Sequence, residues 1–313
     1  MESVSLDTLT FDHPAASRPA RFGAMLSLPM QAASPSSCMV ILTSSAGVQR
    51  HREHFYAQAL NEAGIAALIV DSFGGRGVRR TVADQTLVSA AQMEGDAFAA
   101  LAWLRSDPRI DPGRIGIMGV SKGGGASLAA AIAVRQKWRR GFPHLFDLHV
   151  AICPGATAQH RDPTTHGKPI FFMLAARDDY TPAPLAIEYA ERMRAAGNRA
   201  IKVKVYGGAH HGWESLGPVF DIKDAENWSC CRNYIEDDGR HFVVAAGRAM
   251  PEPEYQAWAR EHCVTRGARA GGGTEDLRRR ATSDLIAFLQ DHGFGDAGAL
   301  VAKQPQAAPI RVD

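Results

Sequence analysis

The sequence predicts an α/β fold with a mostly parallel, doubly wound sheet and helices on both faces. Six short apolar runs, rich in Val and Ile and without polar alternation, are typical of strands covered on both sides. They span residues 38–43, 66–70, 114–119, 149–153, 169–174 and 201–206. Segments with helical spacing lie between several of them, and this alternation favours parallel strands joined by crossover helices.

Length and composition agree with this class. The chain has 313 residues, of which 45% are hydrophobic and 22% charged, so we expect residues 1–313 to form one domain with a large core. The formal net charge of +2 gives no electrostatic reason to expect a nucleic acid or a membrane as partner. No apolar run predicts a membrane span, and the acidic N-terminus does not resemble a signal peptide. We therefore expect a cytoplasmic protein acting on a small molecule.

Helix and turn signals place the remaining elements. Residues 54–63 precede the helix stop signal Gly64, and residues 94–104 show helical spacing before Asp107-Pro108. Residues 3–11 and 21–28 are predicted as an antiparallel edge hairpin joined through the region of Pro14 and Pro19.

The alternation breaks after His211. Residues 227–246 predict a hairpin that turns at Asp238-Gly239, followed by a glycine connector at 271–273 and a helix near 274–291. We interpret residues 214–273 as a lid-like insertion near the site, and we expect the tail, 304–313, to be frayed.

The cysteines favour free thiols. Their number is odd, which argues against a disulfide scaffold and favours a reducing compartment. None of their spacings matches a zinc site. Cys38 and Cys153 lie in apolar runs, where cysteine acts as a small hydrophobic residue. The alternative is a bridge from Cys230 or Cys231 to Cys263.

A pentapeptide, Gly119-Val120-Ser121-Lys122-Gly123, suggests a catalytic serine. Alone it fits a glycine-rich turn equally well. It follows the strand at 115–118 and opens a helix over about 123–134, which is the strand-turn-helix setting of a nucleophile elbow. In that turn the serine has a strained backbone, and the flanking glycines allow the helix and strand to pack closely. We therefore predict that Ser121 is a nucleophile.

A serine nucleophile needs a base and a carboxylate that orients the base. Asp178-Asp179 follow one predicted strand and His210-His211 follow the next, so both pairs share the sheet edge of Ser121. The order Ser, Asp, His is that of α/β-hydrolases. The aspartates could instead cap a helix near Ala183, and the histidines could be inert loop residues. The pattern leaves open which member of each pair acts.

Together these motifs resemble the dienelactone hydrolase family of the α/β-hydrolase superfamily. The resemblance covers about residues 21–213, and residues 263–289 show a weaker similarity to the family. It rests on the Ser121 elbow, on Asp178 with a proline four residues on, and on Tyr206-x-Gly-Ala-x-His211 followed by Gly212 and an aromatic residue. This phasing implies Asp178 rather than Asp179, and His211 rather than His210. The founding members use cysteine where this chain has serine, and the family also contains serine carboxylesterases.

The expected oxyanion hole needs about two amide donors. One is the N–H of Lys122, and we favour the N–H of Ser45, after the strand at 38–43, as the second. The alternative for that loop is a plain glycine turn. We expect the Lys122 side chain to point to solvent or pack on the rim.

Substrate contacts are predicted at four side chains. In the loop 71–77, which resembles a family loop, Arg76 could hold a substrate carboxylate, or could simply pair with a nearby acid. Phe73, Tyr180 and Trp213 could form apolar walls, although aromatic residues at strand ends often only pack.

The sequence thus predicts a serine hydrolase of carboxylic esters or lactones that forms an acyl-enzyme. The partner is a small-molecule ester or lactone, and no cofactor or metal is implied. Alternatives are an acyltransferase or perhydrolase on the same triad, or an inactive binding protein of this fold. The oligomeric state is left open.

Overall fold

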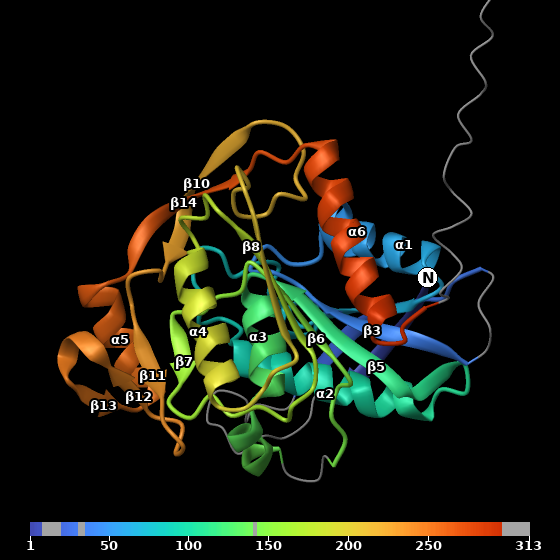
Figure 1. The fold of residues 1–313 in the computed structure, drawn as a ribbon. Helices are drawn as coiled ribbons and strands as arrows, with labels where there is room; N and C mark the ends of the chain where they lie inside the picture. The colour runs from blue at the N-terminus through green and yellow to red at the C-terminus, as the bar shows by residue number, and fades with distance from the viewer. Residues whose placement is uncertain (8–19, 31–34, 140–142, 296–313) are drawn as a thin grey trace, which may run out of the picture.

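An eight-stranded sheet forms the centre of the computed structural model, which describes residues 1–7, 20–30, 35–139 and 143–295 (Figure 1). Its order is β1-β2-β4-β3-β5-β6-β8-β9. The bounds are β1 Glu2–Asp7, β2 Arg21–Ser27, β3 Ser36–Leu42, β4 Ala66–Asp71, β5 Ile110–Val120, β6 His149–Ile152, β8 Ile170–Ala175 and β9 Ile201–Tyr206. From β4 to β9 all neighbours pair in parallel. The predicted fold class and its six strands are confirmed, but β9 at the edge of the sheet is not buried as predicted, because Lys202, Lys204 and Val205 are exposed.

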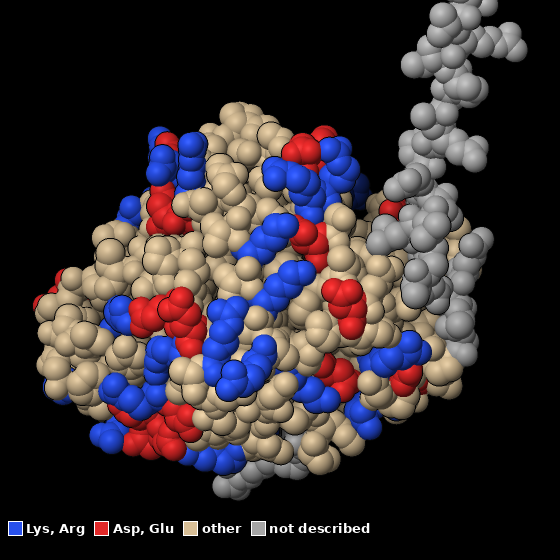
Figure 2. All heavy atoms as spheres, in the orientation of Figure 1, with Lys and Arg blue, Asp and Glu red and all other residues tan. Residues whose placement is uncertain are grey.

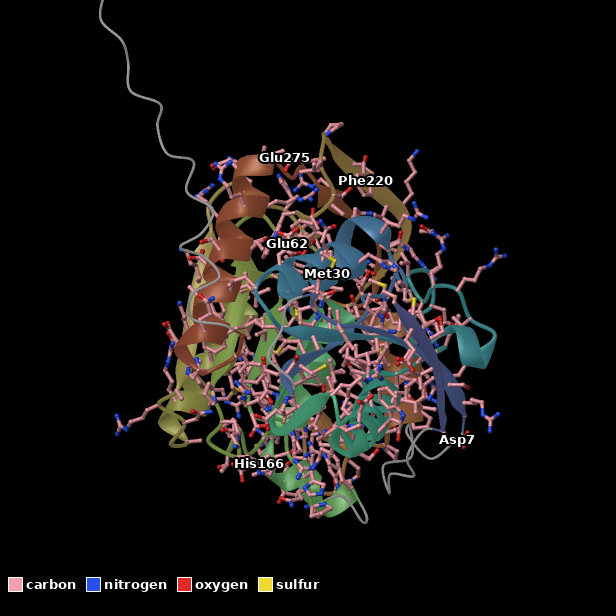
Figure 3. All side chains as sticks on the ribbon, turned by 90° about the vertical axis from the view of Figure 1, so that its right-hand side faces the viewer. Asp7, Met30, Glu62, His166, Phe220 and Glu275 are labelled. Carbon is pink, nitrogen blue, oxygen red and sulfur yellow. A yellow bond between two sulfur atoms is a disulfide. The ribbon has the colours of Figure 1, made fainter. Side chains whose placement is uncertain are left out.

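Helices cover both faces of this sheet. On one face lie α1 (Phe55–Glu62), which follows a π-helical turn at Arg50–His54, and α6 (Glu275–Asp291). On the other lie α2 (Ala90–Ser106), α3 (Lys122–Ala131) and α4 (Ala183–Ala195). Figure 3 shows α1 and α6 side by side at their labelled residues Glu62 and Glu275. The predicted doubly wound arrangement therefore holds.

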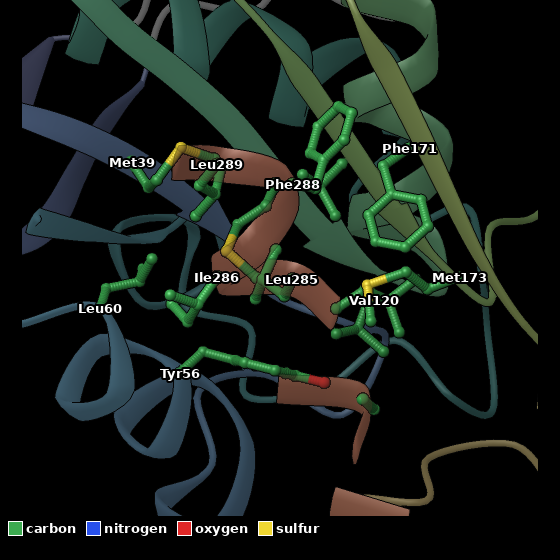
Figure 4. Close-up of a cluster of buried hydrophobic side chains, with 14 of the residues drawn as sticks. Met39, Tyr56, Leu60, Val120, Phe171, Met173, Leu285, Ile286, Phe288 and Leu289 are labelled. Carbon is green, nitrogen blue, oxygen red and sulfur yellow. The ribbon is translucent and has the colours of Figure 1, made fainter. Parts of the chain in front are cut away.

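The core between the sheet and α6 shows why the helix forms where it does. Leu285, Ile286, Phe288 and Leu289 of α6 are buried. Phe288 packs against Phe171 of β8, and Ile286 lies toward Leu60 of α1 in Figure 4. The spacing of the four α6 residues follows the helical period, so one face of α6 is apolar. A Thr274 hydroxyl caps the helix start by accepting the N–H of Leu277 at 3.1 Å.

The N-terminal strands β1 and β2 form the expected antiparallel edge, and β2 continues antiparallel onto β4. Residues 8–19, with Pro14, Pro19 and the predicted strand end at residue 11, lie outside the described residues. The tail at 304–313 lies outside them as well.

Between β9 and α6 the chain builds two small sheets. β10 (Val219–Asn227) pairs antiparallel with β14 (Thr265–Gly271). β11 (Asn233–Ile235) and β12 (His241–Val243) form the predicted hairpin, whose turn contains Gly239 in the left-handed region. β13 (Arg248–Met250) extends this hairpin, and β7 (Ala158–His160) pairs parallel with β11. We did not predict β7, β10, β13 or β14, because short or polar strands carry little periodic signal.

A disulfide corrects one expectation. Cys231 and Cys263 are bonded, with Cα atoms 5.2 Å apart, so the prediction of free thiols is wrong for this pair. The residue after helix α5 (Glu252–His262) and the turn after β10 meet in a small apolar cluster, which brings the two sulfurs together. Cys38, Cys153 and Cys230 are free.

Charges of both signs are interspersed over the face shown in Figure 2. Within the described ranges no helix combines the length and apolarity that crossing a bilayer requires.

Candidate active site

Ser121 lies in a strained turn between β5 and α3. Its φ of 57° and ψ of −115° are a combination that residues with a side chain rarely adopt, and it is the N-cap of α3. Its N–H donates to the Ile152 carbonyl at 2.8 Å, and its own carbonyl accepts the N–H of Gly125 at 2.9 Å. These bonds hold the predicted elbow conformation in place.

The flanking glycines are required by close backbone contacts. A Cβ on Gly119 would lie 2.3 Å from the carbonyl carbon of Gly123. A Cβ on Gly123 would lie 2.5 Å from the Thr43 carbonyl oxygen, at the end of β3. Both distances are shorter than the distances that Cβ atoms keep from other heavy atoms in proteins. The two glycines of the Gly-x-Ser-x-Gly pattern are therefore required by the packing of this turn.

Asp178 and His211 form a buried pair. The Nδ1 atom of His211 lies 2.8 Å from Oδ2 of Asp178. Asp178 Oδ1 accepts the N–H groups of Tyr180 at 2.9 Å and Thr181 at 2.7 Å. Burial raises the pKa of Asp178, but the neighbouring His211 and the hydrogen bonds outweigh it and leave the pKa below its ordinary value. Asp178 is therefore an anion that can fix the His211 ring.

Thr181, which the sequence analysis did not single out, joins these two residues. Its hydroxyl lies 2.9 Å from Asp178 Oδ2, 3.1 Å from His211 Nδ1 and 2.9 Å from the Cys153 carbonyl oxygen. The pattern Asp-x-x-Thr after a strand is a turn signal that could have indicated this contact.

Cys153 also contacts the pair. It lies at the end of β6 with a φ of 41°, and burial raises the pKa of its thiol well above the ordinary value, as do Asp178 and Glu214. Cys153, Asp178 and His211 have ligand atoms within 4.8 Å of one another, which is a possible metal geometry. Without a metal, the thiol contacts Asp178, which helps to raise its pKa, and His211 Nδ1 faces Asp178 Oδ2 at 2.8 Å. The three side chains therefore contact one another.

The neighbours of this pair are engaged elsewhere. Asp179 Oδ2 forms an ion pair with Arg269 Nε at 2.7 Å. His210 is buried and packs near Gly272. The N-cap of α4 is Pro182, without a side-chain cap, so neither aspartate has the alternative role of helix cap. It is Asp178 and His211 that the structure brings together.

A cavity of about 190 Å³ opens at Ser121. Its walls combine predicted and unpredicted residues: Ser45, Gln85, Ala90, Ser121, Lys122, Gly125, Gly155, Thr157, Tyr180, Thr181, Glu226 and Trp228. The Tyr180 ring meets the His211 ring edge-on, with centroids 5.1 Å apart. We call this cavity the Ser121 pocket.

The Lys122 side chain does not point to solvent or to the rim, as we had expected. Its Nζ donates to Thr81 Oγ1 and to the carbonyls of Gln85 and Val88, each at 2.8 Å. Burial lowers the pKa of Lys122 to about 7, against the raising effect of Asp84 and Glu226. The loop folds over the start of α3, so the ammonium group is satisfied by that loop's oxygens.

Three predicted substrate residues lie away from the Ser121 pocket walls. Arg76 makes a bidentate pair with the buried Asp96, at 2.7 and 2.9 Å, which is the ion-pair alternative we left open. Phe73 packs in the core beneath α2, and Trp213 packs against Tyr206. Of the four, Tyr180 lines the pocket.

A polar bridge spans the pocket at Gln85. Its Oε1 accepts from Ser45 Oγ and its Nε2 donates to Tyr180 OH, both at 2.8 Å. Its N–H donates to Glu226 Oε2 at 2.7 Å, and Glu226 in turn pairs with Arg260 of α5 at 3.0 Å. The bridge thus ties the pocket to the segment between β10 and β14. Isolated Gln and Glu residues carry no sequence signal for such a contact.

A family model for the dienelactone hydrolase family matches residues 22–226. The chain belongs to the dienelactone hydrolase family. Membership supports an ester hydrolase, in agreement with the resemblance noted from the motifs. A comparison with curated proteins found no match.

Solved structures of family-like enzymes share the fold. A tabun-treated form of esterase 2 from Thermogutta terrifontis has a TM-score of 0.57 at 15% identity, covering 94% of this chain and 96% of that chain. The propionate-bound form of that esterase gives 0.55 at 14% identity, with coverages of 88% and 90%. A candidate dienelactone hydrolase from Klebsiella pneumoniae gives 0.51 at 18% identity, with coverages of 68% and 89%. These likenesses show the α/β-hydrolase fold.

Proposed function

We propose that this protein hydrolyses carboxylic esters or lactones through an acyl-enzyme on Ser121. The observation that carries the proposal is the strained elbow of Ser121 together with the buried Asp178–His211 pair, since Thr181 contacts that pair and lines the Ser121 pocket with Ser121. His211 takes the proton of Ser121 and returns it to the leaving alcohol, while Asp178 holds the ring tautomer. Water then releases the acyl group.

The oxyanion is proposed to bind at the N–H groups of Lys122 and Ser45. Both residues line the Ser121 pocket. In the loop after β3 the N–H of Ala46 is already donated to Ser44 Oγ at 3.1 Å, which favours Ser45 as the second donor. Losing one such donor typically costs about a hundredfold in kcat.

The size of the Ser121 pocket favours a short acyl group. About 190 Å³ is below the range of roughly 300–1,000 Å³ typical of drug-sized ligands. Tyr180 and Trp228 would flank that group. We further propose that residues 214–273, which supply Glu226 and Trp228 to the wall, act as an insertion that covers the site.

The test is hydrolysis of 4-nitrophenyl esters of increasing acyl length by the wild type and by Ser121→Ala. The proposal expects a loss in kcat of about 10⁴ or more in the variant, for every ester. Activity above a thousandth of wild type in a correctly folded Ser121→Ala protein would remove Ser121 as the nucleophile. Acetate and butyrate should react faster than octanoate.

A further inference from the structure

The two residues proposed to bind the oxyanion lie on different segments of the chain. Lys122 opens α3 directly after Ser121, whereas Ser45 lies in the loop after β3, and both line the Ser121 pocket. Gly123 packs on the Thr43 carbonyl, which places the end of β3, but Ser45 lies two residues further along. Oxyanion donors act because their positions are fixed before charge develops. The loop of Ser45 must therefore be held in place relative to the start of α3.

Residues 81–88, which we call the 81–88 loop, hold Ser45 at two points. The N–H of Thr81 donates to the Ser45 carbonyl at 2.7 Å. The Ser45 hydroxyl donates to Gln85 Oε1 at 2.8 Å. The backbone and the side chain of Ser45 are thus both bonded to the same loop.

The Lys122 side chain holds the same loop from the start of α3. Its Nζ contacts Thr81 Oγ1, the Gln85 carbonyl and the Val88 carbonyl, each at 2.8 Å. These three contacts lie at the beginning, the middle and the end of the 81–88 loop. Two short routes therefore lead from the Lys122 ammonium group to Ser45, one through Thr81 and one through Gln85.

The contacts of Lys122 suit both of its protonation states. An ammonium group has three N–H donors, and it meets three acceptors here. The two carbonyls only accept, whereas the Thr81 hydroxyl can accept from the ammonium group or donate to the neutral amine. Burial lowers the pKa of Lys122 to about 7, so both forms are present near neutral pH. The link between Lys122 and the loop therefore does not depend on the charge of the amine.

Further contacts join the 81–88 loop to the segment between β10 and β14. Its residues bond Glu226 of β10, Arg260 of α5 and Arg266 of β14. These contacts do not involve Lys122 and remain when its side chain is replaced. Loss of the ammonium group should therefore loosen the loop at Ser45 and leave the fold intact.

We propose that the Lys122 side chain is a positioning residue for the oxyanion hole, because it holds the 81–88 loop and thereby fixes Ser45 relative to Ser121. The inference rests on the proposed function and adds a residue to its machinery. Lys122 then serves twice. Its N–H donates to the oxyanion, and its ammonium group positions the second donor.

The first test is Lys122→Met, which keeps the backbone N–H and most of the side-chain volume but removes the ammonium group. With 4-nitrophenyl butyrate, kcat should fall about 30-fold, somewhat less than the cost of losing a donor outright. Acylation and deacylation both pass through an oxyanion, so both should slow together and KM should stay within about twofold. The matched control Lys137→Met, at an exposed lysine, should keep kcat and KM.

A transition-state analogue separates positioning from stability. The boron of n-propylboronic acid bonds to the Ser121 oxygen while His211 takes the proton, and the tetrahedral anion resembles the oxyanion of a butyryl ester. In Lys122→Met its Ki should rise by about the factor by which kcat/KM falls. A side chain that only stabilised the fold would leave the Ki of the folded variant unchanged.

Thr81→Val tests the same link without changing Lys122. The variant removes the hydroxyl but keeps the N–H that bonds the Ser45 carbonyl, so kcat should fall about fivefold at unchanged KM. Combined with Lys122→Met it should cause little further loss, because both variants break the same contact. Thr86→Val, in the same loop but bonded to Asp84, should keep the wild-type kcat. If Lys122→Met does not fold, the Thr81 and Thr86 variants decide alone.

The outcomes separate this inference from the proposed function. A folded Lys122→Met protein with wild-type kcat and Ki, or a loss seen only in KM, would overturn the positioning role. The proposed function would stand in that case if Ser121→Ala is inactive. Hydrolysis of the esters by Ser121→Ala would instead remove the proposed function itself.

Discussion

The sheet edge at Ser121 and the segment between β10 and β14 are held by different kinds of contact. At the sheet edge the reacting residues are placed by strand ends, since Ser121 follows β5, Asp178 follows β8, and Gly119 packs against Gly123 within one turn. The other segment is held by long-range contacts, such as the Cys231–Cys263 bond and the Glu226–Arg260 pair. They meet where the Gly271 N–H donates to the His211 carbonyl at 2.8 Å. The strand ends and the turn at Ser121 therefore position the reacting groups. Contacts between distant segments shape the Ser121 pocket.

The largest expected effect lies at the sheet edge. Asp178→Asn keeps the shape of the side chain but allows the wrong His211 tautomer, so kcat should fall about 10³–10⁴. The matched variant Asp179→Asn loses an exposed ion pair with Arg269 and should stay within about threefold of wild type. Steady-state kinetics with 4-nitrophenyl acetate measures kcat for both variants. A larger loss in Asp179→Asn than in Asp178→Asn would show that the wrong aspartate has been assigned.

The next effect concerns the disulfide. Replacing Cys231 and Cys263 together by alanine opens a loop with a sequence separation of 32, and should lower the free energy of unfolding by about 3 kcal/mol. Cys230→Ala, at an exposed free thiol, should change it by less than about 0.5 kcal/mol. Urea unfolding of both proteins makes the comparison. Equal stabilities would mean that the bond does not hold this segment.

A smaller effect should depend on pH through Lys122. Its folded pKa of about 7 lies below the ordinary 10.5, so between these values the unfolded chain binds a proton that the folded protein lacks. Stability of the wild type relative to Lys122→Met should therefore rise with pH, by about 2 kcal/mol from pH 7 to 9. Urea unfolding at both pH values measures this difference. Lys137→Met, which retains Lys122, should keep the wild-type profile, and a difference for Lys122→Met that does not change with pH would contradict the lowered pKa of Lys122.

The smallest effect is expected at Cys153. Cys153→Ala removes a thiol that hydrogen-bonds to Asp178, and should lower kcat about fivefold, equivalent to about 1 kcal/mol. KM should not change, because Cys153 is absent from the described wall of the Ser121 pocket. Cys153→Ser restores a donor and should recover most of kcat. A change confined to KM would argue against this positioning role.

These contrasts follow what the sequence could and could not predict. The parallel strands and the Ser121 turn were predictable, because apolar runs and the strand-turn-helix pattern are visible within short stretches of sequence. Choosing Asp178 over Asp179 needed the family phasing, since both follow the same strand. Gln85, Glu226 and the buried Lys122 ammonium were beyond prediction, because their partners lie in distant segments. The pairing of Cys231 with Cys263 could not be decided from the sequence for the same reason. The two cysteines meet only once β10, β14 and α5 have packed.

The account depends most directly on Ser121 as the nucleophile, and covalent labelling tests it. The wild type should react with one equivalent of a fluorophosphonate, lose esterase activity in step, and show the added mass on the peptide that contains Ser121. Asp178→Asn should label much more slowly, because His211 no longer activates the hydroxyl. Full loss of activity with the label on another residue, or full activity with Ser121 labelled, would contradict the account.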